Sequence, residues 1–438
     1  MASALAGLRD RVRGSLFVVP MVFVIAGVLL AEVMLRLDGR SLDVPDRLTA
    51  TVDSARAVLT VVSSATLAFA GVAFSVALLL ISQAASQYSP RVVHGLFRDP
   101  FTRRVMGVVI GTFTYCLVVL RAVRAPLDGA GEAVIPSMSI LLAVVLGVVA
   151  ILSTVGFISH AAHSLDVSHV LHRVTAEALD ALPAPATGPA GRAATPALPQ
   201  GPAQVVSFAE HGWVQGIDVD KLLGSLPAAT TVELLTRPGG FAVPGAPLAR
   251  VWPDRSIGDR AAAERIAEAV RAAVRTGPAR TLVDDPQYGV RQLADVALRA
   301  LSPGTNDPTT AEDALFHLAV VLRAALLAAP PDAVRQHEDR VVVAEPAASP
   351  GSLIDLAFDE VRLAAIGQPR VLVAILDVLA RLGASLPSGM TATRSALAHQ
   401  ADLTLRCSDL GDVPDEDRRL VRDAYRRLFA EHPLPAAR

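Results

Sequence analysis

The sequence has few of the residues that hold small secreted proteins together or draw proteins to nucleic acid. Only two of its 438 residues are cysteine, Cys116 and Cys407, so the chain has no disulfide framework. Lysine occurs once, as Lys221. The 40 basic residues face 42 acidic ones, and a net charge of −2 gives no general attraction to nucleic acid, which we exclude as a partner. Charged residues make up 19% of the chain, below the roughly 25% of soluble domains.

Apolar residues are abundant instead, and they are concentrated in the N-terminal part. No charge occurs over the 24 residues 58–81 or over the 22 residues 137–158. Each window exceeds the roughly 20 residues that a helix needs to cross a bilayer. The sequence therefore predicts a protein whose main partner is the lipid bilayer.

Two further segments qualify less clearly as spans. The first, near the N-terminus, contains Pro20 and Glu32, and the other is short but bracketed by arginines that can reach the interface. A cleaved signal peptide is the alternative for the first segment, and its length and the three spans after it disfavour that. We predict a transmembrane domain over 1–180, with helices at about 16–35, 58–81, 105–121 and 137–159.

Arginines in the short loops indicate the orientation. Eight lie on the side of the N-terminus and six on the opposite side. Positive residues favour the cytoplasm, so we expect a multi-pass protein of the cell inner (plasma) membrane with both termini cytoplasmic.

Small and hydroxylated residues crowd the spans. Gly107 precedes Gly111 by four residues, a spacing that lets helix backbones approach closely, within one chain or between subunits of a homo-oligomer. The other interpretation is that hydroxyl groups line a polar path. Its candidate residues are Ser63, Ser64, Thr66 and Ser75.

After the fourth span, the helical pattern continues through 159–179 and contains four histidines: His160, His163, His169 and His172. One straight helix places the first two about half a turn from the others, so they cannot share one ion. We predict no metal site and no cofactor.

The remaining chain predicts a soluble α+β domain, so the fold class is a membrane α-helical part of four transmembrane helices followed by that domain. Residues 181–204 are rich in Ala, Pro and Gly and predict a linker. Short β-type runs separated by turn residues predict a small β module over 205–255. Apolar residues at helical spacing then predict an α-helical cytosolic region over 256–438. One isolated β run, 340–344, is expected to pair with the β module.

Several motifs together resemble a known family. They are Ser86-Gln-Tyr-Ser-Pro-Arg91, Gly111-Thr-Phe-Thr-Tyr115, Phe157-Ile-Ser-His160, Gly212-Trp-Val-Gln215 and the stretch from Asp284 to Thr310. In this order they resemble the bacterial predicted membrane proteins called domain of unknown function 2254, from about the first span to about Ala328. The resemblance implies four spans and a soluble C-terminal domain, and it implies no activity.

The last of these motifs supplies most candidate ligand or interface residues. Arg291, Asp295 and Arg299 recur every four residues and so share one helix face. The candidates are Ser89, Pro90, Arg91, Tyr288, Arg291, Asp295, Arg299, Ser302, Asn306 and Asp307. One interpretation is a helical hairpin that Asn306 or Asp307 caps and salt bridges brace. The other is a pocket or subunit contact in which the arginines bind a small anionic ligand or a partner carboxylate.

Catalytic motifs such as a phosphate-binding loop, a nucleophile elbow or a zinc-protease helix are absent from the sequence. We therefore expect no enzyme and no catalytic residue. The favoured hypothesis is an oligomeric channel or transport-related assembly, conducting an ion or solute, with a cytosolic sensing domain. The alternative is a membrane-anchored structural or signalling scaffold that binds cytosolic proteins.

Overall fold

The computed structural model divides the chain into two compact units, Met1–His169 and Val170–Arg438. It describes residues 18–38, 51–87, 100–123, 136–164, 166–183, 198–253, 260–329, 332–345 and 348–431.

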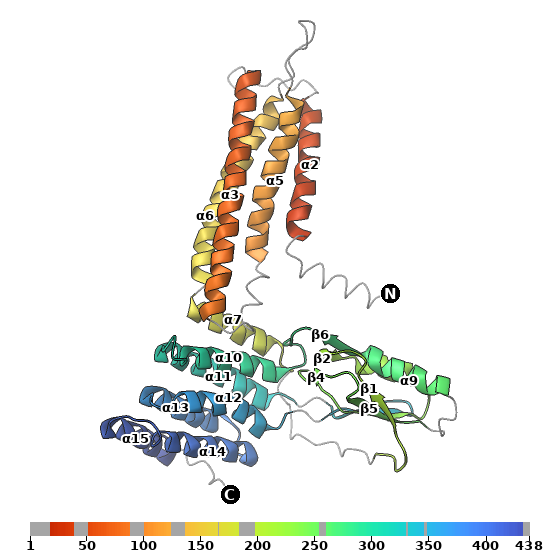
Figure 1. The fold of residues 1–438 in the computed structure, drawn as a ribbon, viewed down its shortest axis with the longest axis vertical. Helices are drawn as coiled ribbons and strands as arrows, with labels where there is room; N and C mark the ends of the chain where they lie inside the picture. The colour runs from red at the N-terminus through yellow and green to blue at the C-terminus, as the bar shows by residue number, and fades with distance from the viewer. Residues whose placement is uncertain are drawn as a thin grey trace. The chain divides into compact units, whose positions relative to one another are not determined.

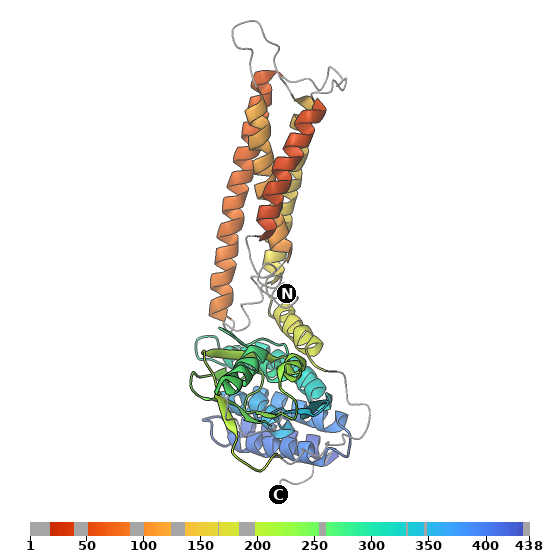
Figure 2. The ribbon, with the colours of Figure 1, turned by 90° about the vertical axis from the view of Figure 1, so that its right-hand side faces the viewer.

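The first unit is a bundle of long apolar helices that lie side by side (Figures 1 and 2). They are α2 (Val18–Asp38), α3 (Val52–Gln87), α5 (Pro100–Ala122) and α6 (Ser137–Ser164). Each is long and apolar enough to cross a membrane, which confirms the four predicted spans. The helices extend past the apolar windows because polar residues continue the helical turns beyond them. For example, α3 begins at Val52 rather than near residue 58.

Helix α5 is the centre of this bundle and packs against α2, α3 and α6. Its glycines permit the closest approach: a Cβ added to Gly27 of α2 would lie 2.6 Å from the carbonyl oxygen of Gly111. A Cβ added to Gly111 would lie 2.9 Å from the carbonyl oxygen of Phe23. The expectation that small residues bring these helices together is therefore confirmed for α2 and α5.

A separate helix, α7 (Val167–Asp180), follows the bundle. The prediction of one continuous helix through residues 159–179 is wrong, because α6 ends at Ser164. The Asp166 carboxylate accepts a hydrogen bond of 3.0 Å from the backbone N–H of Ser168. This interaction satisfies a free N–H at the start of α7 and favours a new helix there.

The second unit contains two β-sheets whose strands are mostly antiparallel. The strands are β1 (Gln204–Ser207), β2 (Gly212–Ile217), β3 (Thr231–Leu234), β4 (Phe241–Ala242), β5 (Pro247–Trp252), β6 (Val274–Gly277), β7 (Val334–His337) and β8 (Arg340–Val343). One sheet has the order β1-β5-β3-β8-β7 and the other β4-β2-β6. Strand β8 pairs with β3 in parallel, which confirms the pairing expected for the isolated run. Residues far apart in the chain therefore build this β region.

Two helices, α8 (Val219–Ser225) and α9 (Arg260–Ala273), accompany the sheets. The hydrophobic core that these helices form with the sheets contains Val214, Leu222, Val232, Leu248 and Ile266, all at most 4% exposed.

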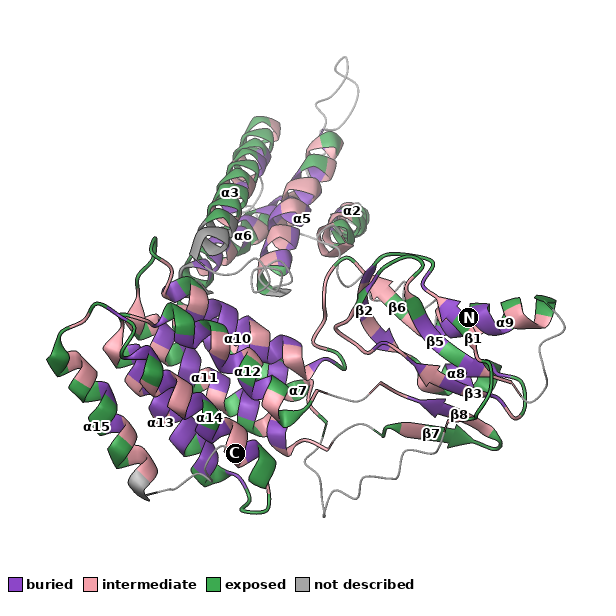
Figure 3. Cartoon of the chain, turned by 60° about the horizontal axis from the view of Figure 1, so that its bottom comes forward, coloured by how far each residue is buried: buried purple, intermediate pink, exposed green. Residues whose placement is uncertain are grey.

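The rest of the second unit is an array of helices in two layers (Figure 3). They are α10 (Pro286–Ala300), α11 (Pro308–Leu327), α12 (Pro350–Ala364), α13 (Pro369–Ser385), α14 (Thr391–Cys407) and α15 (Asp415–Glu431). Helices α10, α12 and α14 contact in succession, as do α11, α13 and α15. The first four begin with proline, whose missing N–H and fixed φ suit the first helical turn. The four apolar helices and the mixed soluble part confirm the predicted fold class.

Candidate functional site

A compact polar site lies at the start of α10, where Arg280 and Asp285 form a bidentate ion pair. Arg280 Nη2 lies 2.7 Å from Asp285 Oδ2 and 2.9 Å from Oδ1, and Arg280 Nε lies 2.9 Å from Oδ2. The Asp285 side chain is 3% exposed and that of Arg280 is 18% exposed. Burial raises the pKa of Asp285 above its ordinary value, and the charge of Arg280 opposes this shift.

Two aromatic rings hold the Arg280 guanidinium. Its central carbon lies 5.6 Å from the ring centroid of Trp213 and 5.2 Å from that of Tyr288. Trp213 belongs to β2 and Tyr288 to the first turn of α10. Arg280 therefore links two motifs that the sequence presented as separate, Gly212–Gln215 and the stretch that begins at Asp284.

The backbone beside this pair is shaped to fit it. Gly239 has a φ of +86°, and a Cβ there would lie 2.8 Å from Arg280 Nη2 and closer still to the Asp285 carboxylate. Gln215 Nε2 donates a hydrogen bond of 2.8 Å to the carbonyl oxygen of Ala279. These contacts fix the β region to α10. None of Arg280, Asp285 and Gly239 was predicted as a site residue, although Asp285 lies in the motif from Asp284 to Thr310.

A second ion cluster joins α10 to α12. Arg291 Nε lies 2.7 Å from Asp295 Oδ1, which confirms that this pair shares a helix face. The guanidinium also binds both oxygens of Glu360, at 2.6 Å from Nη1 and 2.9 Å from Nη2. Hydrogen bonding to Glu360 raises the pKa of Arg291. A carboxylate of the same chain therefore occupies the predicted anion-binding position, and its side chain is 55% exposed.

The loop between α10 and α11 is braced as a hairpin. Asp307 caps α11 by accepting hydrogen bonds from Thr310, 3.1 Å from its backbone nitrogen and 2.6 Å from Oγ1. These bonds lower the pKa of Asp307. Asn306 has a φ of +46° and accepts a hydrogen bond of 3.1 Å from Gln368 Nε2, while Ser302 Oγ donates to the carbonyl oxygen of Arg299 at 2.7 Å. Of the two predicted caps, Asp307 is the one that the structure uses.

Comparison with known proteins shows which family has this sequence pattern. The family model for the predicted membrane proteins called DUF2254 matches residues 13–381. The chain belongs to this family. The match extends past Ala328, where the motifs in the sequence fade, and covers α12 and most of α13.

Two mycobacterial proteins are similar to this DUF2254 chain over most of its length. The uncharacterised protein Rv1290c of Mycobacterium tuberculosis is 29% identical over 428 residues, which are 95% of this chain and 81% of the relative. The uncharacterised protein Mb1321c of Mycobacterium bovis has the same identity and the same coverage. No solved structure matches the chain.

The hydroxyl groups of α3 divide between two faces in the DUF2254 bundle. Ser63 and Thr66 are buried, and their hydroxyls donate to carbonyl oxygens of their own helix. Ser64 and Ser75 are exposed on the single-chain bundle. Three further predicted site residues, Ser89, Pro90 and Arg91, lie outside the described residues.

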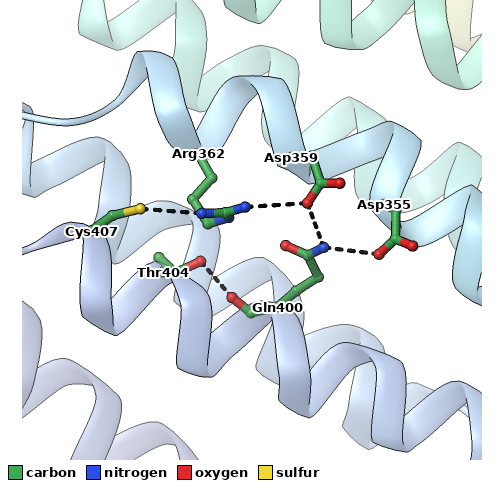
Figure 4. Close-up of polar contacts among 6 residues, drawn as sticks. All are labelled: Asp355, Asp359, Arg362, Gln400, Thr404 and Cys407. Carbon is green, nitrogen blue, oxygen red and sulfur yellow. Dashed lines mark hydrogen bonds and ion pairs between the residues drawn. The ribbon is translucent and has the colours of Figure 1, made fainter.

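A partly buried polar cluster between α12 and α14 was not predicted from the sequence (Figure 4). Gln400 Nε2 donates to Asp355 and Asp359 at 2.9 and 2.8 Å. Arg362 donates to Asp359 Oδ1 and to Cys407 Sγ, both at 3.2 Å. The two helices are about 40 residues apart in the chain, so no local spacing indicates the cluster.

The histidines do not assemble into a metal centre among the residues that the structure describes, where no group of three metal-binding side chains lies close enough. His160 packs against Phe101 with ring centroids 4.8 Å apart. His317 of α11 shares a hydrogen bond of 2.8 Å with Thr175 of α7.

Proposed function

We propose that this DUF2254 protein is an oligomeric channel or transport-related assembly, without catalytic activity, whose soluble unit senses a ligand. One observation carries the proposal. Four small residues of α3 recur every three or four positions and are all exposed on the single-chain bundle: Ser64, Ala68, Gly71 and Ser75. We call this row the α3 stripe. Subunits that pack along it could approach closely and place the hydroxyls of Ser64 and Ser75 beside a path between subunits.

Flux measurements on the full-length protein in lipid vesicles test this proposal. We expect ion or solute flux, which Ser64→Phe should reduce at least tenfold together with self-association. Val155→Phe is the matched control, because Val155 lies on α6 and is also exposed, at 60%. A folded oligomer that conducts none of a panel of inorganic ions and small solutes would refute the transport function.

The sensing part of the proposal concerns Arg291. An anion that displaces the exposed Glu360 carboxylate would weaken the link between α10 and α12. Inorganic phosphate is the probe, followed by calorimetry on the full-length protein. We expect Glu360→Gln to tighten phosphate binding and Arg291→Gln to abolish it. Equal behaviour of both variants and the wild type would exclude Arg291 as the sensor.

A scaffold is the second candidate, and the two-layered helix array favours it. Arrays of helix pairs offer long surfaces that bind other proteins. A partner that co-purifies in a fixed ratio would support the scaffold. A protein that still functions normally after Ser63, Ser64 and Thr66 are replaced by alanine would also support it.

We also propose that both termini face the cytoplasm of the inner membrane, on the basis of the arginine distribution. The test places a cysteine in the linker 181–204 and applies a membrane-impermeant thiol reagent. Labelling should require broken cells, whereas labelling of intact cells would reverse the orientation.

A further inference from the structure

The outer face of α11 carries apolar side chains flanked by opposite charges. The row consists of Thr309, Asp313, Phe316, Val320, Arg323 and Leu327, which we call the α11 stripe. At about 100° per residue, its members fall within an arc of about 80°. Phe316 is 42% exposed and Val320 is 50% exposed. A helix of a soluble unit usually packs its apolar residues against the core. Because Phe316 and Val320 are exposed instead, this face of α11 is available to a partner.

The two charges of the stripe form no ion pair among the described residues. Asp313 and Arg323 are exposed, and neither forms an ion pair with another residue that the structure describes. Ten residues separate them, which is about 15 Å along a helix, so they cannot pair with each other. An occupant of the stripe should therefore present a basic group near Asp313 and an acidic group near Arg323.

The stripe itself has this complementary pattern when its direction is reversed. Its members lie at equal distances on either side of the buried Leu318: Phe316 and Val320 are two residues away, and Asp313 and Arg323 are five. Two antiparallel copies centred there would set Phe316 against Val320 of the second copy. The same arrangement would set Asp313 against Arg323 of the second copy, twice. This is the self-complementarity that a two-fold symmetric contact requires.

We propose that the α11 stripe binds the α11 stripe of a second copy of this chain in antiparallel orientation, about a two-fold axis that passes between the two helices at the level of Leu318. The occupant is a second copy because, in reverse order, the four central members set each apolar residue against an apolar one and each charge against the opposite charge. A parallel pair would place Asp313 against Asp313 and is disfavoured by repulsion. This contact is distinct from the packing along the α3 stripe in the proposed function, and its test does not depend on flux.

Disulfide trapping in membranes tests the register on the full-length chain. One copy carries Asp313→Cys and one tag, and the other carries Arg323→Cys and a second tag. Oxidation should produce a dimer that contains both tags. Asp313→Cys alone should give none, because the two positions would lie about 15 Å apart along the axis and a disulfide needs Cα atoms within about 7 Å. The native Cys116 and Cys407 are buried and serve as the background control.

Charge exchange provides the second test, by measuring the dimer dissociation constant in detergent. Asp313→Arg alone or Arg323→Asp alone should weaken the dimer at least tenfold, because like charges then face each other. The double variant should recover most of this loss. Since these side chains are exposed, folding should survive, and circular dichroism checks it.

Three results would overturn the proposal: a double variant no tighter than the single ones, cross-linking of Asp313→Cys to itself, or a different protein seated on the stripe. Loss of the dimer in the single variants with unchanged flux would retain this interface and remove it from the transport mechanism. Absence of flux with normal trapping would refute only the transport function.

Discussion

Asp38, the last residue of α2, caps the distant helix α6 through Ser139. Its Oδ2 accepts hydrogen bonds from the backbone nitrogen of Ser139 at 3.1 Å and from the Ser139 hydroxyl at 2.5 Å. Its Oδ1 accepts a further bond of 3.0 Å from the backbone nitrogen of Met138. The Tyr115 hydroxyl then donates to the carbonyl oxygen of Ser139 at 2.9 Å. One carboxylate thus joins the ends of α2 and α6, and α5 completes the contact.

Asp38→Ala should destabilise the bundle by about 1 kcal/mol, the usual cost of losing a helix cap. Asp38→Asn retains one acceptor oxygen and should lose less. Thermal unfolding of the purified full-length protein, followed by circular dichroism, measures both. Equal unfolding midpoints for Asp38→Ala and the wild type would show that the cap does not stabilise the helices.

Gly27→Ala should destabilise the contact between α2 and α5 by about 1–3 kcal/mol, because the new methyl group would overlap the Gly111 carbonyl. Gly156→Ala is the control, since a Cβ there would lie at an ordinary 3.6 Å from Phe101. Unfolding in increasing SDS should separate the two variants. A Gly27 variant as resistant as the Gly156 variant would contradict the close approach.

Asp285→Ala should cost about 3 kcal/mol, because it leaves the Arg280 guanidinium between two rings without its carboxylate. Replacing Arg280 by Lys keeps the charge but loses the bidentate geometry, and it should have an intermediate effect. Hydrogen exchange of α10 and β2 reads out the junction directly. If protection falls in neither element, the pair does not link them.

Acid should destabilise the second unit through His317. Burial lowers the pKa of His317 below its ordinary value of about 6.5, His172 lowers it further and Asp313 opposes the shift. The unfolded chain therefore takes up a proton more readily, so this contribution to stability is present above pH 6.5 and is lost as the pH falls below it. The unfolding midpoint should drop more steeply with acid in the wild type than in His317→Gln.

The exposed His337→Gln variant is the control for this pH dependence and should follow the wild type. Identical pH profiles for the wild type and His317→Gln would exclude His317 as the acid-sensitive group.

Local patterns in the sequence account for much of this fold. The charge-free windows predicted α3 and α6, and the periodic apolar residues predicted α9 to α15, because burial in lipid or in a core dictates which residues each helix carries. The cap at Asp307, which the sequence offered together with Asn306, and the pair of Arg291 with Asp295 could also be predicted from the sequence. The interacting residues lie only three or four positions apart in the chain.

Contacts between distant segments could not be predicted in this way. The Glu360 partner of Arg291 lies 69 residues further along the chain, and the Asp38 cap of Ser139 spans 101 residues. Strands β6 and β7 were missed because each has only four residues. Strand β6 pairs with the remote β2, whereas β7 pairs with the adjacent β8 at the edge of its sheet and is largely exposed, so it shows little apolar pattern. The break between α6 and α7 was missed because apolar periodicity continues across it.

The scarcity of charge, the two charge-free windows and the two weaker apolar segments determined from sequence alone that this is a membrane protein of four helices with a separate soluble part. The tertiary structure alone decided which polar groups are already satisfied within the chain. It fills the Arg291 site with Glu360 and, among the described residues, leaves the α3 and α11 stripes exposed. The physical reason is that the hydrophobicity of a segment depends only on its own residues and can be read from the local sequence. Hydrogen bonds and ion pairs depend instead on which distant residues folding brings within about 3 Å of each other.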